Sequence, residues 1–304
     1  MKTTPPTQTA LSLSVATLML LVGLPAQAAA PGEPEIQTYS VDMEAKVLSD
    51  RRTNGLSDTY RRPGAEFTVT AAHESGLLGY LQLGTVAKES FPGGNKTTAL
   101  AALGYRWGQP EGWHFGVGAA QEMFPGSSVE APDNALSPTS LIKTNFDTTF
   151  GLFEFGYGII EARYLLVLSK DFRGNNTSVV CGAAAQIAMI EGDATFGEAS
   201  TCYDRGYQHS RGTQLLQVEA KLPVNSSTHV VMHLGYTAVR KFSFLNTLDY
   251  KLGVNHTRWG FDFEADLVGG VMRNNYYGKT ANTSLTSVKR IDRPALMFSI
   301  AKRF

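Results

Sequence analysis

The sequence predicts an all-β protein, an antiparallel transmembrane β-barrel of twelve strands with short periplasmic turns and longer extracellular loops. Three observations support this prediction. The chain of 304 residues begins with an export signal, many stretches alternate apolar with polar residues, and the connections between those stretches alternate long with short. We therefore expect one barrel domain in an exported protein.

The N-terminal segment has the features of a secretory signal peptide. Lys2 is its only charged residue, residues 11–24 form an apolar run, and the small residues at positions 26–28 supply a cleavage site. The run is shorter than the ~20 apolar residues that a membrane-spanning helix needs. We expect a signal peptide over residues 1–28 and an outer membrane β-barrel over residues 29–304.

The first expected strand lies within residues 38–50 and separates two kinds of side chain. Apolar residues occupy every second position, and the positions between them carry charges such as Asp42, Glu44 and Lys46. Successive side chains of a strand point to opposite faces, so one face is apolar and the other is charged.

The same alternation recurs along the chain and is clearest within residues 261–270, where Asp262, Glu264 and Asp266 alternate with apolar residues. The intervals between the connections hold three further strands, which brings the expected number to twelve. The alternating stretches are residues 38–50, 64–73, 97–107, 112–120, 159–169, 213–223, 248–257, 261–270 and 295–304.

Alternation alone fits a soluble β-sandwich as well as a membrane barrel, and the connections distinguish the two. Long loops on one side and tight turns on the other are typical of an outer membrane barrel. The tight connections are residues 73–76, 107–112, 156–158, 224–228 and 258–260. The other connections are residues 52–63, 89–95, 123–144, 171–211, 243–247 and 273–293.

The last expected strand, residues 295–304, ends in Phe304. An unpaired strand edge is not tolerated in hydrocarbon, so this strand is expected to pair with the first and close the barrel. Phe304 is then the C-terminal insertion signal for the barrel assembly machinery and lies at the periplasmic interface. Trp107, Trp113 and Trp259 stand near strand ends, as an interfacial aromatic girdle requires.

Charge and cysteine content restrict the partners. The chain has 27 Lys and Arg against 27 Asp and Glu, which argues against nucleic acid as a partner. Cys181 and Cys202 are the two cysteines of an exported chain, and a disulfide is the favoured interpretation. A metal pair is the alternative, but it is weakly supported because the two cysteines lack nearby histidines at ligand spacing. No cofactor is implied.

Residues 48–67 resemble the opening of the TorF family of porins, in which a Ser-Asp pair precedes a Gly, a Ser and a Pro that starts the second strand. Residues 168–174 and 299–304 are also similar to that family, so the resemblance spans most of the mature chain. The matching positions are Ser49, Asp50, Gly55, Ser57 and Pro63, followed by Ser75, Gly76 and Gly79 of the next hairpin.

The sequence departs from this family in three places. Arg51, Thr53 and Asn54 stand where the family usually has aromatic residues and an arginine. Leu77 or Leu78 stands in place of the aromatic residue of the next hairpin, and residues 171–211 look like an insertion. The resemblance implies a porin of the outer membrane and leaves the solute open.

Charged residues on the polar faces are the candidate functional residues. They either line a water-filled lumen and select small hydrophilic solutes or ions, or pair with one another and plug a narrow barrel. The acids of residues 262–266 are the candidate cation-favouring strip, with Arg163, Lys221 and Lys251 as counterparts. The expected lumen residues are Asp42, Glu44, Lys46, Glu161, Arg163, Glu219, Lys221, Asp249, Lys251, Asp262, Glu264 and Asp266.

Other functions remain open at this point. Residues 171–211 are long enough to fold inward or cap the mouth, or they decorate the surface, and the basic residues 273–293 are candidates for lipopolysaccharide phosphates. A non-conducting structural or adhesive barrel is the alternative to a channel. A lipid hydrolase is less supported, because His209 and Ser210 are adjacent in the chain and a catalytic pair also needs a third, orienting group.

Overall fold

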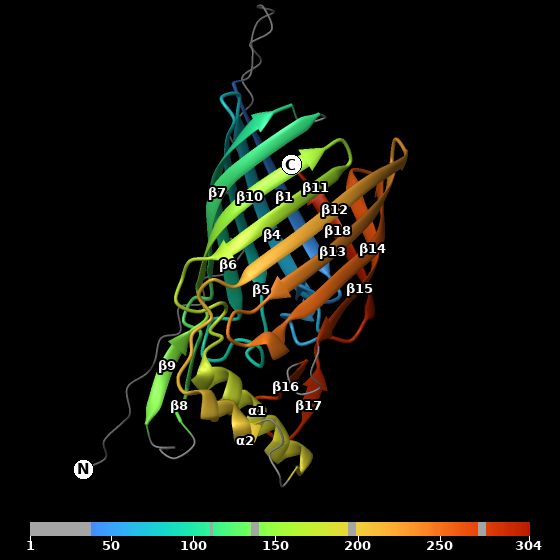
Figure 1. Cartoon of the computed structure of the whole chain (residues 1–304). Helices are drawn as coiled ribbons and strands as arrows, with labels where there is room; N and C mark the ends of the chain where they lie inside the picture. Colours follow the sequence, from blue (N-terminus) through green and yellow to red (C-terminus); the bar gives the residue numbers. More distant parts are fainter. Residues whose placement is uncertain (1–37, 110–111, 135–139, 194–198, 273–277) are drawn as a thin grey trace, which may run out of the picture. The chain divides into compact units, whose positions relative to one another are not determined.

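Twelve strands close into an antiparallel barrel in the computed structural model, which describes residues 38–109, 112–134, 140–193, 199–272 and 278–304 (Figure 1). The predicted signal peptide lies outside these residues. The barrel strands are β1 (Tyr39–Leu48), β4 (Gly64–His73), β5 (Leu77–Thr85), β6 (Thr97–Gly108), β7 (Trp113–Met123), β10 (Thr148–Tyr157), β11 (Ile160–Val167), β12 (Gln214–Asn225), β13 (Thr228–Ala238), β14 (Thr247–Arg258), β15 (Phe261–Met272) and β18 (Ala295–Arg303).

The barrel closes between its first and last strands, as the sequence predicts. Lys46 of β1 is opposite Glu66 of β4 on one side and Ala301 of β18 on the other. Beyond β18, the backbone N–H of Phe304 donates to the carbonyl oxygen of Met43 at 3.0 Å. All twelve strands therefore have two neighbours, and the barrel has no open edge.

The outer face of the barrel is apolar and exposed. Val47, Leu103 and Leu296 retain 63%, 62% and 61% of their accessible surface. Contact of so much apolar surface with water costs about 25 cal/mol per Å², so this wall is suited to hydrocarbon. Trp113 and Trp259 are exposed beside tight turns, where an aromatic girdle is expected.

Tight turns join the strands at one end of the barrel, and long connections join them at the other. The long connections form additional elements, and among the described residues no helix is long and apolar enough to span a membrane. These elements are β2 (Arg52–Thr53), β3 (Leu56–Ser57), β8 (Ser128–Pro132), β9 (Leu141–Asn145), α1 (Thr177–Glu191), α2 (Ala199–Cys202), η2 (Tyr203–Arg205), η3 (Ser243–Leu245), β16 (Lys279–Ala281) and β17 (Val288–Arg290).

Helix α1 begins and ends at residues suited to those positions. The side chain of Asn176 caps its N-terminus by accepting from the backbone N–H of Val179 at 3.1 Å. Gly192 follows its C-terminus with a φ of 75°, the left-handed conformation that glycine adopts readily. The sequence analysis describes this segment only as a long connection, because two capping residues are a weaker signal than the alternation of the neighbouring strands.

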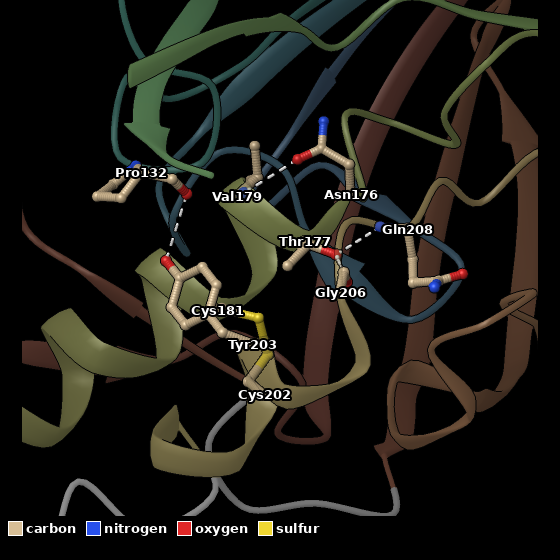
Figure 2. The surroundings of a disulfide bond; sticks show 9 residues. All are labelled: Pro132, Asn176, Thr177, Val179, Cys181, Cys202, Tyr203, Gly206 and Gln208. Carbon is tan, nitrogen blue, oxygen red and sulfur yellow. Dashed lines mark hydrogen bonds between the residues drawn. A yellow bond between two sulfur atoms is a disulfide. The ribbon is translucent and has the colours of Figure 1, made fainter. Parts of the chain in front are cut away.

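A disulfide joins α1 to the segment that follows it. Cys181 is bonded to Cys202, and the hydroxyl of Tyr203 donates to the carbonyl oxygen of Pro132 in β8 (Figure 2). Thr177 accepts from the backbone N–H of Gln208 at 2.8 Å. These contacts hold α1, α2 and the β8–β9 hairpin together as one cap at the long-loop end.

Replacing both Cys181 and Cys202 by serine is expected to destabilise this cap by about 3 kcal/mol, because the bond restricts the unfolded chain between two residues separated by 21 positions. Limited proteolysis with trypsin should then cut faster at Arg205 and Arg211, both exposed. The barrel strands should keep their resistance, which serves as the internal control. Equal cutting rates in the double variant and the parent chain would contradict a stabilising role for the bond.

Candidate channel lumen

The twelve predicted lumen residues belong to β1, β11, β12, β14 and β15. On β1 and β15 they alternate with exposed apolar residues, and the strand registers place Glu44 opposite Arg303 and Asp262 opposite Ala301. The structure brings most of them together in small ion-paired groups. It does not form one continuous ring of like charge.

Glu264 of β15 is the centre of the first group. Its carboxylate lies 3.2 Å from Nζ of Lys46 and accepts hydrogen bonds from Ser299 at 2.9 Å and Asn255 at 3.1 Å. Lys46 also lies 3.5 Å from Glu44. One buried cation is thus held by two acids from adjacent parts of the wall.

Near the tight-turn end, Arg303 bridges two acids. Its guanidinium lies 3.2 Å from Glu44 and 3.2 Å from Asp262. The side chains of Arg303 and Lys221 stay 67% and 64% exposed, although both belong to the inner face. Water therefore reaches the lumen from this end.

The opposite wall carries a second group. Arg163 of β11 lies 2.5 Å from Glu161 and 3.6 Å from Glu154 of β10, and Arg106 of β6 also pairs with Glu154. This wall is nearly balanced in charge, because two guanidinium groups face two carboxylates.

Further along β13 and β14, His233 hydrogen-bonds to Asp249 at 2.8 Å and Lys251 is opposite His233. Asp266 has no ion pair among the described residues, and its carboxylate occupies the space where a side chain at position 253 would lie, beside Gly253. The acids of β14 and β15 thus exceed the cations that pair with them, and this wall carries negative charge.

The long-loop half of the lumen is crossed by the β2–β3 hairpin. The chain leaves β1 and reaches the far wall, where Asn54 accepts from the side-chain amide of Gln217 on β12 at 3.2 Å. Strand β12 is five strands from β1 in the barrel order. The hairpin, residues 52–57, therefore spans the interior and narrows it.

Gly55, at the tip of the hairpin, is required by its surroundings. Its φ is +76°, and a Cβ added there would lie 2.7 Å from both the carbonyl oxygen of Gly269 and Cα of Gly270. Only glycine permits this approach to β15 without displacement. The position is one of those that match the TorF pattern.

Five charged residues fix the hairpin to the wall, and we call them the ion cluster: Arg51, Asp58, Glu66, Glu122 and Arg173. Arg51 lies 2.5 Å from Asp58 and 2.8 Å from Glu66 of β4. Arg173 lies 3.1 Å from Asp58 and 2.5 Å from Glu122 of β7. Asp58 is thus shared by two arginines from different loops.

Arg173 is enclosed on its remaining sides. Its guanidinium lies 5.6 Å from the ring centre of Phe91 and 5.4 Å from that of Phe124. Burial alone would lower the pKa of Arg173, but Asp58 and Glu122 beside the guanidinium raise this pKa above its ordinary value. The arginine therefore remains charged and holds three loops together.

The final long connection covers the hairpin from outside. The backbone N–H of Ser57 donates to the carbonyl oxygen of Ile291 at 3.0 Å, and Tyr60, Ala87 and Ile291 pack as a buried apolar cluster. The predicted basic segment 273–293 contributes this cover, and its first residues, 273–277, lie outside the described ones.

Sequence reasoning identified the inner faces but not the loop that fills them. It left residues 171–211 open as an infolded loop, a cap of the mouth or a surface decoration, whereas the hairpin of residues 52–57 crosses the lumen and Arg173 of the later segment pairs with Asp58. The available signal was the resemblance itself, because the motif residues Asp50, Gly55 and Ser57 cluster in this loop.

The histidine and serine residues considered for catalysis are used structurally. His209 lies 2.8 Å from Asp171, but the hydroxyl of Ser210 donates to the carbonyl oxygen of Asn175 at 2.6 Å and accepts from the backbone N–H of Phe172. Ser210 is fully buried. Within the described ranges, no group of three or more His, Cys, Asp or Glu residues is arranged to hold a metal ion.

No family model matches the chain, and no curated protein matches its sequence. Solved structures share the barrel fold at low similarity. The KdgM porin is 4% identical, with 87% of this chain and 97% of that chain covered and a TM-score of 0.42. The outer membrane phospholipase A from Escherichia coli is 8% identical, with 86% and 94% covered and a TM-score of 0.36.

A Salmonella typhi OmpF structure, in complex with daunomycin, is 8% identical, with 88% and 97% covered and a TM-score of 0.37. These proteins include both porins and a phospholipase. At these scores the likeness assigns no activity to this chain, so its function has to be inferred from its own lumen.

Proposed function

We propose that this protein is a narrow outer membrane channel for passive diffusion of small hydrophilic solutes or ions, with a preference for cations. The observation that carries the proposal is the water-accessible, charge-lined lumen at the tight-turn end, where Lys221, Arg163 and Arg303 remain partly exposed. Acids outnumber bases along the β14–β15 wall, which favours cations as permeants.

The outer membrane location is supported by the chain itself. The apolar exterior needs lipid, and the closed barrel satisfies its backbone without an open edge. The predicted signal peptide supplies export, and the resemblance to the TorF family points to the same membrane. We also propose that the barrel assembly machinery inserts the chain into the outer membrane and that Phe304 is part of the signal it recognises.

The hairpin of residues 52–57 and the ion cluster form the constriction of this channel. Asp58 and Glu122 are buried and paired, whereas Arg303 and Lys221 of the tight-turn half keep most of their side-chain surface exposed. Small solutes and ions pass beside such a constriction, and large ones are excluded. A lumen sealed by the same contacts is the non-conducting alternative.

Single-channel recording from the refolded mature protein in a planar lipid bilayer tests the proposal. Discrete conductance steps with a cation-selective reversal potential across a KCl gradient are expected. A folded barrel that stays silent in the bilayer would overturn the channel function in favour of a structural or adhesive barrel. Hydrolysis of phospholipid by that silent barrel would instead establish the enzymatic alternative.

Neutralising the acidic strip is expected to reduce cation preference. In the triple variant Asp262→Asn, Glu264→Gln and Asp266→Asn, Lys46 and Arg303 lose acidic partners, so the reversal potential should shift toward anion permeation. The matched control carries Glu130→Gln and Asp204→Asn, two exposed acids of the loops. A reversal potential that is the same in the triple variant and the parent chain would remove the strip from the selectivity mechanism.

A further inference from the structure

A cationic pocket of about 610 Å³ lies at the long-loop end, beside the start of β4 and the end of β5. Its charged lining consists of Arg62, Lys88, Lys96 and the single acid Glu89. Thr85 and Thr283 add hydroxyl groups. The pocket is separate from the lumen residues described above.

The strand register places this pocket on the outside of the barrel wall. Ala65 and Thr85 line it, and they alternate with the inward-facing Glu66 and Gly84, so they belong to the outer face. On the same face of β5, Leu83 and Leu81 are 41% and 39% exposed. A cationic pocket thus lies directly beyond an apolar wall suited to acyl chains.

The positive charge of the pocket is not neutralised by the protein. Arg62 lies 2.8 Å from Glu89, yet its side chain stays 56% exposed. Lys88 and Lys96 are exposed, and neither has an ion pair within the described part of the chain. Two lysines and the outer side of one arginine are therefore available to an anion.

The pocket also offers neutral donors beside these cations. The Oγ1 atom of Thr85 accepts from the backbone N–H of Ala65 at 3.0 Å, which leaves the hydroxyl proton free to donate. A phosphate monoester carries a charge of about −1.5 to −2 at neutral pH and three strong acceptor oxygens. Its charge and acceptors match two lysines and a hydroxyl group.

We propose that this pocket binds the phosphate-bearing headgroup of an anionic lipid, whose acyl chains lie against the outer faces of β4 and β5. The lipid is favoured over a soluble anion because the cations border the apolar wall instead of the lumen. The proposal rests on the membrane placement of the barrel, and it does not require that the lumen conduct.

Native mass spectrometry of the refolded mature chain in detergent tests the proposal. The probes are phosphatidic acid and phosphatidylcholine with identical acyl chains, and inorganic phosphate. Wild-type protein is expected to retain phosphatidic acid in preference to phosphatidylcholine. The variant Lys88→Gln with Lys96→Gln should lose about tenfold or more in affinity for phosphatidic acid, since each surface cation attracts an anionic lipid.

The matched control is Lys170→Gln with Lys241→Gln, which removes two exposed lysines from other connections of the same end and should bind as the wild type does. Equal retention of the two lipids, or unchanged affinity in the Lys88/Lys96 variant, would overturn the proposal. Full competition by inorganic phosphate at low concentration would overturn the lipid assignment and indicate a soluble-anion site. Bilayer recordings of the Lys88/Lys96 variant should give the same conductance as the wild type, so a loss of lipid binding can be distinguished from a loss of channel function.

Discussion

Replacing Arg173 by alanine is expected to lower the free energy of unfolding by about 3–5 kcal/mol, because one partner of a buried ion network is removed and the others remain. Asp58 and Glu122 would lose the guanidinium that both contact, and each is almost fully buried. Urea unfolding of the barrel in lipid vesicles measures the change. The same variant should raise single-channel conductance, because Asp58 belongs to the loop that crosses the lumen.

Arg205→Ala is the matched control, because Arg205 is an exposed arginine of the same long connection. It should change neither stability nor conductance. Arg173→Lys separates charge from geometry, since lysine retains the charge but lacks the planar fork that engages two carboxylates. If Arg173→Ala unfolds at the same urea concentration as the parent chain, the ion cluster does not stabilise the loop end.

Deleting residues 53–56, the tip of the infolded hairpin, is expected to increase single-channel conductance severalfold. The tip reaches from β1 to Gln217 on β12, so its removal widens the narrowest part of the interior. Arg52 and Ser57 are paired across the hairpin, so the shortened chain can be rejoined with little rearrangement. Conductance and the largest permeant sugar in a liposome swelling assay are the two measurements.

The control deletion removes residues 283–286 from the β16–β17 hairpin, where the backbone N–H of Asn282 donates to Ser287 in a comparable turn. That hairpin lies outside the lumen, so conductance should stay at the parent value. If deleting residues 53–56 also leaves conductance unchanged, ions do not pass beside the hairpin, and the constriction must be sought elsewhere.

The sequence predicted the barrel well because a transmembrane strand has two faces in two different solvents. In β15, Asp262, Glu264 and Asp266 alternate with apolar residues, and this period fixes both the secondary structure and the direction of each side chain. Strand number and closure follow from the regular alternation of turns and loops. Such information is local, so a single sequence contains it.

The interior contacts depend on residues far apart in the chain, and the sequence did not predict them. Arg173 meets Asp58 across 115 residues and Glu122 across 51 residues. No periodicity marks such a pairing, and an isolated arginine in a loop resembles any solvated charge. The sequence does not predict helix α1 because small and apolar residues lie on all its sides, so its buried and exposed faces differ little in polarity.

The separation of Arg173 from its partners also bears on the order of assembly. Asp58 and Arg173 lie in two different connections and Glu122 lies in β7, so the three can meet only after β1, β7 and β11 have taken their places in the wall. The cluster is therefore among the last contacts to form. A chain whose insertion stalls would lack these ion pairs, so its long connections would be more open to proteases than those of a finished barrel.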